Sequence, residues 1–123
     1  MAESRIGPDL HFEGVIGYGA ADAEEAGHFF EHILGLPLSG EEGVLRFYDA
    51  GGVSIAVDVS GALAGEPPYM VFSFPDLTAA AEHFLDRGCS VRELPWAPGD
   101  GFLARSPDGH VVCIVSRDPP ATE

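Results

Sequence analysis

The stretch "VLRFYDAGGVSIAV" (residues 44–57) and the stretch "FLARSPDGHVVCIV" (residues 102–115) share one pattern. Each places two apolar runs, rich in β-branched and aromatic residues, on either side of a turn that contains glycine, and Gly51 aligns with Gly109. Runs of this kind separated by a short Gly-containing turn predict a β-hairpin. Because the two stretches lie far apart in the chain, their similarity indicates an internal duplication.

The residues before each hairpin predict a strand followed by a helix. Residues 15–18 and 69–74 are the predicted strands. Asp22 and Asp76 stand at helix N-cap positions, each ahead of apolar residues at helical spacing. In the first helix these residues form one expected buried stripe, which comprises Ala26, Phe29, Phe30, Ile33 and Leu34.

This order predicts an α+β fold made of two βαβββ modules in tandem within one domain. We expect a flexible N-terminal segment at 1–12, a first module at 13–60, a Gly- and Pro-containing linker at 61–68, a second module at 69–116 and a flexible tail at 117–123. One helix covers one face of each predicted sheet. The opposite faces are then free to enclose a cavity.

The charge of the chain limits its partners. Twenty acidic residues face six arginines and no lysine, which gives a net charge of −14. Such a charge repels nucleic acid and anionic lipid, and it favours cationic ligands. The first residues, Met-Ala-Glu-Ser-Arg, have no apolar run of the kind found in a secretory leader, and no stretch is long and apolar enough to span a bilayer. Cys89 and Cys113 do not form a metal-type pair. We therefore expect a cytoplasmic, reduced protein; distances decide whether the two cysteines form a disulfide.

The stretch "HFFEH" (residues 28–32) matches the H-x-x-E-H pattern of zinc hydrolases. In a regular α-helix, however, His28, Glu31 and His32 fall away from the apolar stripe and face solvent. A catalytic zinc also needs a third protein ligand and a sheltered cleft. The pattern therefore predicts a solvated helix face rather than a zinc site.

Three segments carry a resemblance to a known family. The segments "ADAEEAGHFFEHILGLPL" (21–38), "FPDLTAAAEHFLDRG" (74–88) and "SPDGHVVCIV" (106–115), in this order and spacing, resemble the vicinal oxygen chelate superfamily. That superfamily holds glyoxalase I, extradiol dioxygenases, fosfomycin-resistance enzymes and bleomycin-resistance proteins. The resemblance covers residues 13–116 and implies the tandem βαβββ fold and a homodimer.

The resemblance also implies where a metal ion would be held. The metal-ligand positions of the family's enzymes correspond here to Val15, Tyr69, Cys113, and either Ile55 or Ala56. Aliphatic side chains cannot bind a metal, tyrosine rarely does, and one cysteine is insufficient. A shift in the first strand brings forward Glu13 or His11 without supplying the other ligands. We therefore expect no metal, no cofactor and no catalytic residue.

Strand alternation indicates which residues line the cavity. If Tyr69 faces inward, then Val71 and Ser73 do too, while Met70, Phe72 and Phe74 pack under the helix. Trp96, the single tryptophan, either stacks on a ligand or packs at the core edge or an interface. Cys113 is expected to be a buried, inert thiol. The predicted ligand-binding residues are Tyr69, Trp96, Phe47, Asp58, Val71, Phe102 and Cys113.

These observations predict a non-catalytic protein that resembles the bleomycin-resistance branch of the superfamily. Its function would be to bind or sequester a small organic molecule, cationic or aromatic, without a metal, as antibiotic-resistance proteins of that branch do. The alternative is a metal-dependent, glyoxalase-like lyase or dioxygenase with displaced ligands. A family member retained as an interaction module is a third reading.

Overall fold

The computed structural model describes residues 9–116, so the predicted tail at 117–123 and most of the predicted N-terminal segment lie outside the described residues. The chain forms two compact units. The first unit comprises residues 14–70, and the second comprises residues 71–116 together with 9–13. No helix among residues 9–116 is long and apolar enough to cross a membrane.

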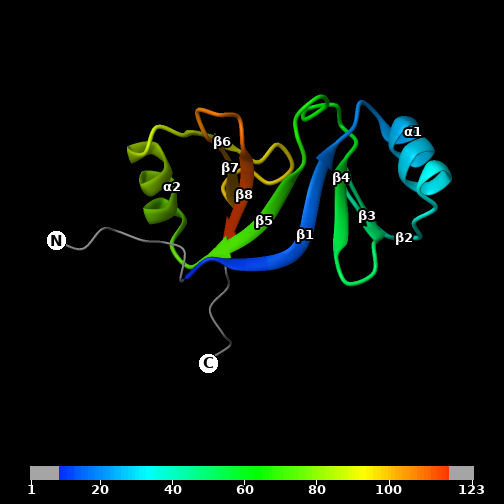
Figure 1. The fold of residues 1–123 in the computed structure, drawn as a ribbon, viewed down its shortest axis with the longest axis horizontal. Helices are drawn as coiled ribbons and strands as arrows, with labels where there is room; N and C mark the ends of the chain where they lie inside the picture. Colours follow the sequence, from blue (N-terminus) through cyan, green and yellow to red (C-terminus); the bar gives the residue numbers. More distant parts are fainter. Residues whose placement is uncertain (1–8, 117–123) are drawn as a thin grey trace. The chain divides into compact units, whose positions relative to one another are not determined.

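In the first unit one helical segment covers one face of a sheet. The strands are β1 (His11–Gly19, of which 14–19 belong here), β2 (Leu38–Glu42), β3 (Leu45–Asp49) and β4 (Ser54–Asp58), in the order β2-β3-β4-β1. β1 is parallel to β4, whereas β3 pairs antiparallel with both β2 and β4. The helical segment, α1 (Ala23–Ala26) continued by η2 (Gly27–Ile33), lies alongside these strands (Figure 1).

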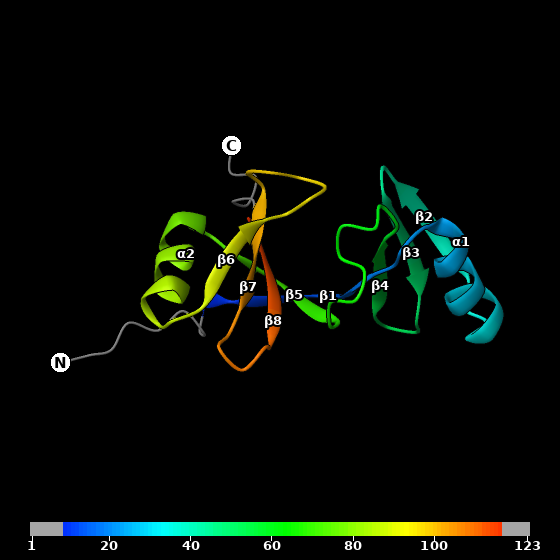
Figure 2. The ribbon, with the colours of Figure 1, turned by 90° about the horizontal axis from the view of Figure 1, so that it is seen from above.

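The second unit repeats this arrangement. Its strands are β5 (Tyr69–Phe74, of which 71–74 belong here), β6 (Ser90–Glu93), β7 (Gly101–Arg105) and β8 (Val111–Ser116), in the order β5-β8-β7-β6. Helix α2 (Leu77–Asp86) packs against β6, β7 and β8 (Figure 2). The equal strand order confirms the predicted α+β fold of two βαβββ modules.

Most element boundaries match the sequence pattern, with two differences. β1 begins at His11 rather than at Val15, and it continues through Gly14, whose φ of +75° is a conformation that glycine adopts without strain. The sequence pattern did not locate β2, because "LSGEE" has no β-branched residue and carries a glycine. Its pairing with β3 makes it a strand.

Both helices begin as the sequence predicts. The carboxylate of Asp22 accepts a hydrogen bond from the Glu25 backbone N–H at 2.8 Å, and Asp76 accepts one from the Ala79 N–H at 3.0 Å. Glu25 in turn accepts a hydrogen bond from the Ala21 N–H at 2.7 Å. These caps satisfy backbone donors that have no partner within the first helical turn.

The predicted apolar stripe of the first helix is wrong for three of its five residues. Phe29, Ile33 and Leu34 are 43%, 60% and 48% exposed, whereas Ala26 and Phe30 are buried. The cause is the winding: residues 27–33 form a π-helix, as the hydrogen bond from the Leu34 N–H to the Phe29 carbonyl over five residues illustrates. A wider helix turns each residue by less than 100°, so residues at α-helical spacing no longer share a face.

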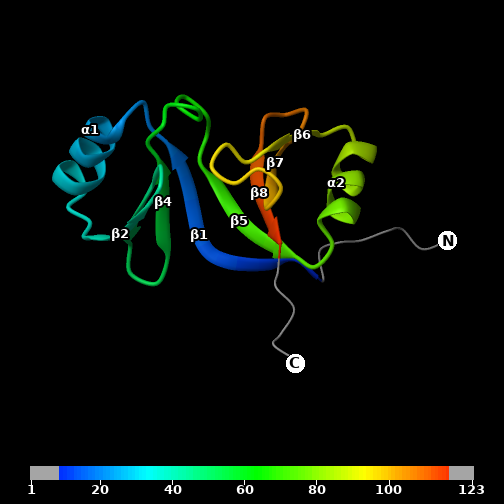
Figure 3. The ribbon, with the colours of Figure 1, turned by 180° about the vertical axis from the view of Figure 1, so that it is seen from behind.

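Each unit has its own apolar core between helix and sheet, and Figure 3 shows both helix–sheet pairs from behind. In the first unit the Phe30 ring stacks on Tyr48, with centroids 5.4 Å apart. In the second unit Phe84 of α2 meets Phe102 of β7 edge to face at 5.9 Å. The buried members of the two cores are Ala20, Ala26, Phe30, Tyr48 and Val57, and Phe74, Ala80, Phe102, Ala104 and Ile114.

The π-helical register predicts that two adjacent residues, Phe29 and Phe30, contribute very different amounts to the free energy of unfolding. Phe30→Ala should lower the free energy of unfolding by about 3–4 kcal/mol, because it empties a packed core site. Phe29→Ala, the matched control, should cost less than about 1 kcal/mol because that ring is 43% exposed. Urea denaturation followed by circular dichroism measures both. Equal losses would contradict the π-helical register.

Candidate functional site: the helix-free sheet faces

Strand register divides the first unit's sheet into a helix side and a side without a helix, here called the helix-free face. Ala56 of β4 lies opposite Gly17 of β1, and Asp58 lies opposite Gly19. Their neighbour Val57 is fully buried in the core beneath the helix. Since successive side chains alternate between faces, Gly17, Gly19, Ala56 and Asp58 share the helix-free face.

Tyr69 lies on this face. A Cβ atom at position 17 would overlap the Tyr69 ring, so the ring rests directly on the Gly17 backbone. Gly17 is paired with Ala56, and Tyr69 is only 4% exposed. A small strand surface thus carries one large amphipathic side chain. Only glycine at position 17 permits this contact.

The register also decides between Ile55 and Ala56. Ile55 packs against the helix-side core, so Ala56 is the residue on the helix-free face. Val15 shares that face through its pairing with Ser54. Valine, alanine and a phenol therefore stand at the positions within this unit for which the resemblance implies metal ligands.

Asp58 is placed differently from what the sequence suggests. A strand-end aspartate is expected to be solvated, yet Asp58 is fully buried. Its Oδ1 accepts hydrogen bonds from the Ser60 N–H at 2.7 Å and the Ser60 hydroxyl at 2.6 Å. Its Oδ2 has no hydrogen-bond partner among residues 9–116. The backbone at Leu63 lies against Gly19, so this loop must move before a ligand can reach the carboxylate.

The remaining predicted ligand-binding residues are divided between the two units. Phe47 is half-buried and pairs with Ala56, which places it on the helix-free face of the first unit. In the second unit Val71 is half-buried and shares a strand face with the buried Ser73. Trp96 is half-buried in the turn after β6.

Two placements differ from the sequence-based alternation. Phe102 packs in the core beneath α2 and does not line the helix-free face, because it pairs with the core residue Ile114. Met70 is 44% exposed rather than packed under a helix. The prediction failed for Phe102 because the hydrophobic pattern of β7 is continuous and does not reveal its faces.

Cys113 lies opposite Leu103 on the helix-free side of the second unit's sheet. It is 1% exposed, and burial raises the pKa of its thiol to about 12. A metal-binding or nucleophilic cysteine needs a thiolate, which this environment disfavours. Cys89 and Cys113 are both free thiols, so no disulfide joins them.

The residues at the implied metal positions do not fit a divalent metal. A phenol and a thiol of raised pKa stand at two of the positions for which the resemblance implies metal ligands, and neither is a common ligand of a divalent metal in this state. His11 and Glu13, the displaced candidates, are both exposed. Within residues 9–116 no group of three or more His, Cys, Asp or Glu side chains is placed to hold a metal ion.

A second polar group lies on the helix side of the first unit. Glu31, expected on a solvated helix face, is half-buried with its side chain 34% exposed. The Tyr48 hydroxyl donates to its Oε2 at 2.8 Å, and Arg46 Nη1 forms an ion pair with the same oxygen at 3.4 Å. Arg46 Nη1 also donates to the Ala23 carbonyl at 3.5 Å. His28 and His32 are exposed, as predicted.

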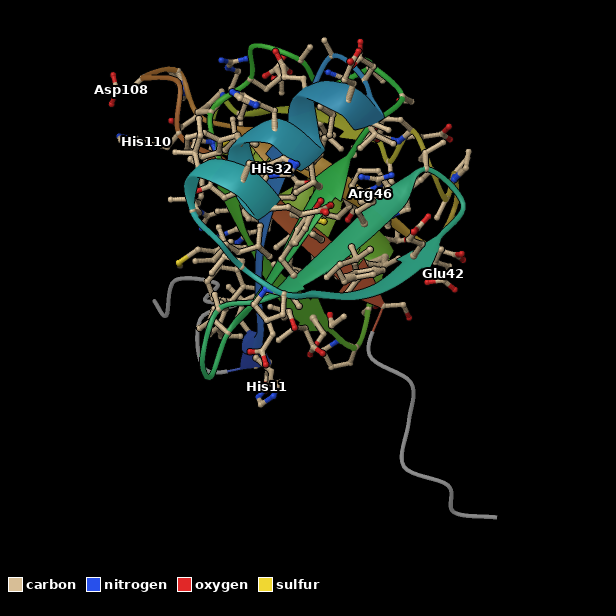
Figure 4. The ribbon with its side chains drawn as sticks, turned by 90° about the vertical axis from the view of Figure 1, so that its right-hand side faces the viewer. His11, His32, Glu42, Arg46, Asp108 and His110 are labelled. Atoms are coloured by element: carbon tan, nitrogen blue, oxygen red, sulfur yellow. The ribbon has the colours of Figure 1, made fainter. Side chains whose placement is uncertain are left out.

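These residues border a hollow of about 440 Å³, here called the π-helix hollow. Figure 4 labels His32 on the helix and Arg46 on the adjacent strand. The lining residues are Ala23, Glu24, Gly27, His28, Glu31, His32 and Arg46. Sequence reasoning missed this group, because it depends on the π-helical winding that turns Glu31 towards the sheet. The i, i+2 spacing of Arg46 and Tyr48 was the available signal that both share one face.

Electrostatics couple the three side chains of this group. The adjacent Tyr48 hydroxyl raises the pKa of Arg46, and the nearby Glu41 and Glu31 carboxylates add to this effect. Burial raises the pKa of Tyr48, and its hydrogen bond to Glu31 raises it further. Glu31 therefore faces a permanent cation and a neutral hydroxyl donor at neutral pH.

Comparison with known proteins identifies the family. The sequence profile of the Glyoxalase/Bleomycin resistance protein/Dioxygenase superfamily matches residues 11–114. The chain belongs to this superfamily. No curated protein matches the chain significantly.

Three solved structures have folds similar to that of this chain. One, described as the NAD-dependent benzaldehyde dehydrogenase from Legionella pneumophila, is 12% identical with a TM-score of 0.59, covering 85% of this chain and 98% of that one. Hypothetical protein BH1468 from Bacillus halodurans C-125 is 13% identical with a TM-score of 0.58, covering 93% and 99%. A superfamily member from Vibrio splendidus 12B01 is 16% identical with a TM-score of 0.53, covering 83% and 95%. At these identities the likeness shows the fold alone.

The raised pKa of Cys113 predicts selective thiol labelling. At pH 8 a thiol of pKa about 12 is ionised in roughly one molecule in ten thousand, so iodoacetamide should modify the half-buried Cys89 and leave Cys113 intact. Mass spectrometry of tryptic peptides measures this, and labelling in urea should reach both residues.

Because the folded-state pKa of the Cys113 thiol exceeds the unfolded value of about 8.5, this thiol's contribution to stability is complete below that pH and is lost towards pH 12. Rapid native labelling of Cys113 would contradict the burial.

The Tyr48–Glu31 hydrogen bond predicts a loss of stability on removal of one hydroxyl. Tyr48→Phe should lower the free energy of unfolding by about 1–2 kcal/mol, because the bond has a charged acceptor. Tyr18→Phe is the matched control, since Tyr18 packs on the same Phe30 ring and no hydrogen bond of its hydroxyl is found among residues 9–116. Urea denaturation compares the two. A Tyr48→Phe protein as stable as the control would show that the bond contributes nothing.

Proposed function

We propose that the protein binds a small organic molecule without a metal ion, and that a cationic or aromatic compound fits it best. The observation that carries the proposal is which residues lie on the helix-free face of the first unit. There Val15 and Ala56 put apolar side chains at positions for which the family resemblance implies metal ligands, and the buried Tyr69 adds a ring and a hydroxyl. This chemistry suits carbon skeletons better than ions.

Charge supports a cationic guest. The chain carries a net charge of −14, which raises the local concentration of cations. Asp58 adds a buried carboxylate to the same face as Tyr69, and its Oδ2 has no partner within residues 9–116. A cationic group that reached this oxygen would gain a charge-assisted hydrogen bond. Phe47 adds an aromatic edge to this face.

The second unit has a helix-free face of the same kind, with Val71 and Cys113 as its small apolar members. Trp96, in a turn of that unit, supplies an indole for stacking. Proteins that sequester antibiotics need affinity and no chemistry, so apolar contact and charge complementarity suffice for such a role. A homodimer and a cytoplasmic location complete the proposal, and both rest on the sequence and the family resemblance.

Isothermal titration calorimetry with a panel of basic, planar antibiotics tests this function, with Trp96 fluorescence as a second readout. At least one compound should bind with a dissociation constant of about 1 μM or lower. Asp58→Asn should weaken that compound about tenfold or more through loss of the charge. Asp108→Asn, at an exposed turn, is the control and should bind as the parent protein does.

Two results would overturn this function. One is the absence of heat and of fluorescence change across the whole panel. The other is elemental analysis of the mildly purified protein that finds about one Ni, Zn, Mn or Fe ion per chain, lost together with an activity on chelation. The second result would favour a glyoxalase-like lyase or a dioxygenase with displaced ligands.

A further inference from the structure

We propose that the π-helix hollow of the first unit is a separate binding site for a small zwitterion that carries both an ammonium and a carboxylate group, such as a free α-amino acid. The hollow lies on the helix side of the sheet, because Arg46 and Tyr48 pair with residues 57 and 55 of the core. The site proposed above for an organic guest lies on the opposite face. The two proposals therefore stand on different residues.

The charges around the hollow favour a ligand with both signs. Glu24 and Glu31 contribute two carboxylates, and Arg46 contributes one guanidinium. A simple anion would meet the two carboxylates, and a simple cation would meet the guanidinium. A zwitterion can place its carboxylate near Arg46 and its ammonium near Glu24, so that both of its charges face an opposite charge.

Arg46 is held in place and still has donors to offer. Its hydrogen bonds to the Ala23 carbonyl and to Glu31 both use Nη1. A guanidinium has five N–H donors in a planar fork, and this geometry matches a carboxylate. Glu31, in turn, is fixed by the Tyr48 hydroxyl at 2.8 Å. The charged groups are therefore positioned before a ligand arrives, which lowers the entropy cost of binding.

The floor of the hollow is kept open by a residue without a side chain. Gly27 has a φ of −62° and a ψ of −41°, which any residue adopts. A Cβ atom there would lie 3.6 Å from both Arg46 Nη1 and Glu31 Oε2. That distance is an ordinary van der Waals contact. Glycine is therefore not required by the backbone at this position, and its effect is to leave space above the Glu31–Arg46 pair.

The rim and the winding of the helix agree with a binding role. The exposed rings of His28 and His32 have centroids 6.3 Å apart and line the hollow, where their nitrogens can donate or accept hydrogen bonds. The π-helix that brings Glu31 towards Tyr48 is a rare element, found frequently at functional sites. A hollow of about 440 Å³ accommodates an amino acid with its side chain.

NMR titration of the full-length protein tests the site. The probes are the twenty standard L-amino acids, each compared with its N-acetyl and methyl-ester derivatives. At least one free amino acid should shift the Gly27 amide and the His28 and His32 ring signals with a dissociation constant on the order of 1 mM or lower. Loss of either charge in a derivative should weaken binding roughly tenfold or more.

Variants separate binding from folding. Gly27→Ala should fill the floor and weaken binding roughly tenfold, while a gain in helix propensity keeps the protein at least as stable as the parent. Glu24→Gln should also weaken binding, because it removes the partner of the ammonium. Glu42→Gln is the control, since Glu42 lies on β2 outside the lining of the hollow (Figure 4). It should bind as the parent does.

Three results would overturn the zwitterion site: no free amino acid shifts these signals, a methyl ester or N-acetyl derivative binds as tightly as its parent, or folded Gly27→Ala binds unchanged. Antibiotic binding at the helix-free face should be the same in Gly27→Ala and in the parent protein. A failure of one proposal is thus distinguishable from a failure of the other.

Discussion

One helix can cover only one face of a four-stranded sheet, and this constraint organises both units of the protein. Each unit has a single helical segment between its first and second strands, and its apolar core lies beneath that segment. The strand residues alternate between the covered side and the helix-free side. Which side a residue takes decides whether it packs in the core, like Val57 and Ile114, or is placed with the candidate ligand-binding residues, like Ala56 and Cys113.

The first unit departs from a regular helix, and its polar chemistry depends on that departure. The π-helical turn exposes Phe29, Ile33 and Leu34 to solvent and brings Glu31 against the sheet. Exposure of apolar side chains opposes folding, since their transfer out of water is favourable. The hydrogen bonds of Glu31 with Tyr48 and Arg46 offset part of this cost. The same winding creates the hollow that we propose as a zwitterion site.

Family membership accounts for the fold and leaves the chemistry to particular residues. The superfamily unites catalysts and binding proteins on one framework, so function must be argued from the site. In this chain the contact of Tyr69 with Gly17 places an aromatic ring on the helix-free face. Asp58, fully buried and bonded to Ser60, is the one polar departure among the four strand residues that define this face.

The sequence alone determined the duplication, the succession of strand, helix and hairpin in each module and both helix caps, because these features depend on local periodicity and on side chains close in the chain. Its alternation pattern also put Val71 and Ser73 on the same strand face as Tyr69. Tertiary structure alone decided the faces of Phe102 and Glu31, the burial of Asp58 and the choice between Ile55 and Ala56. Strand register, helix winding and loop packing set these features, and each depends on contacts between residues distant in sequence, which no local pattern encodes.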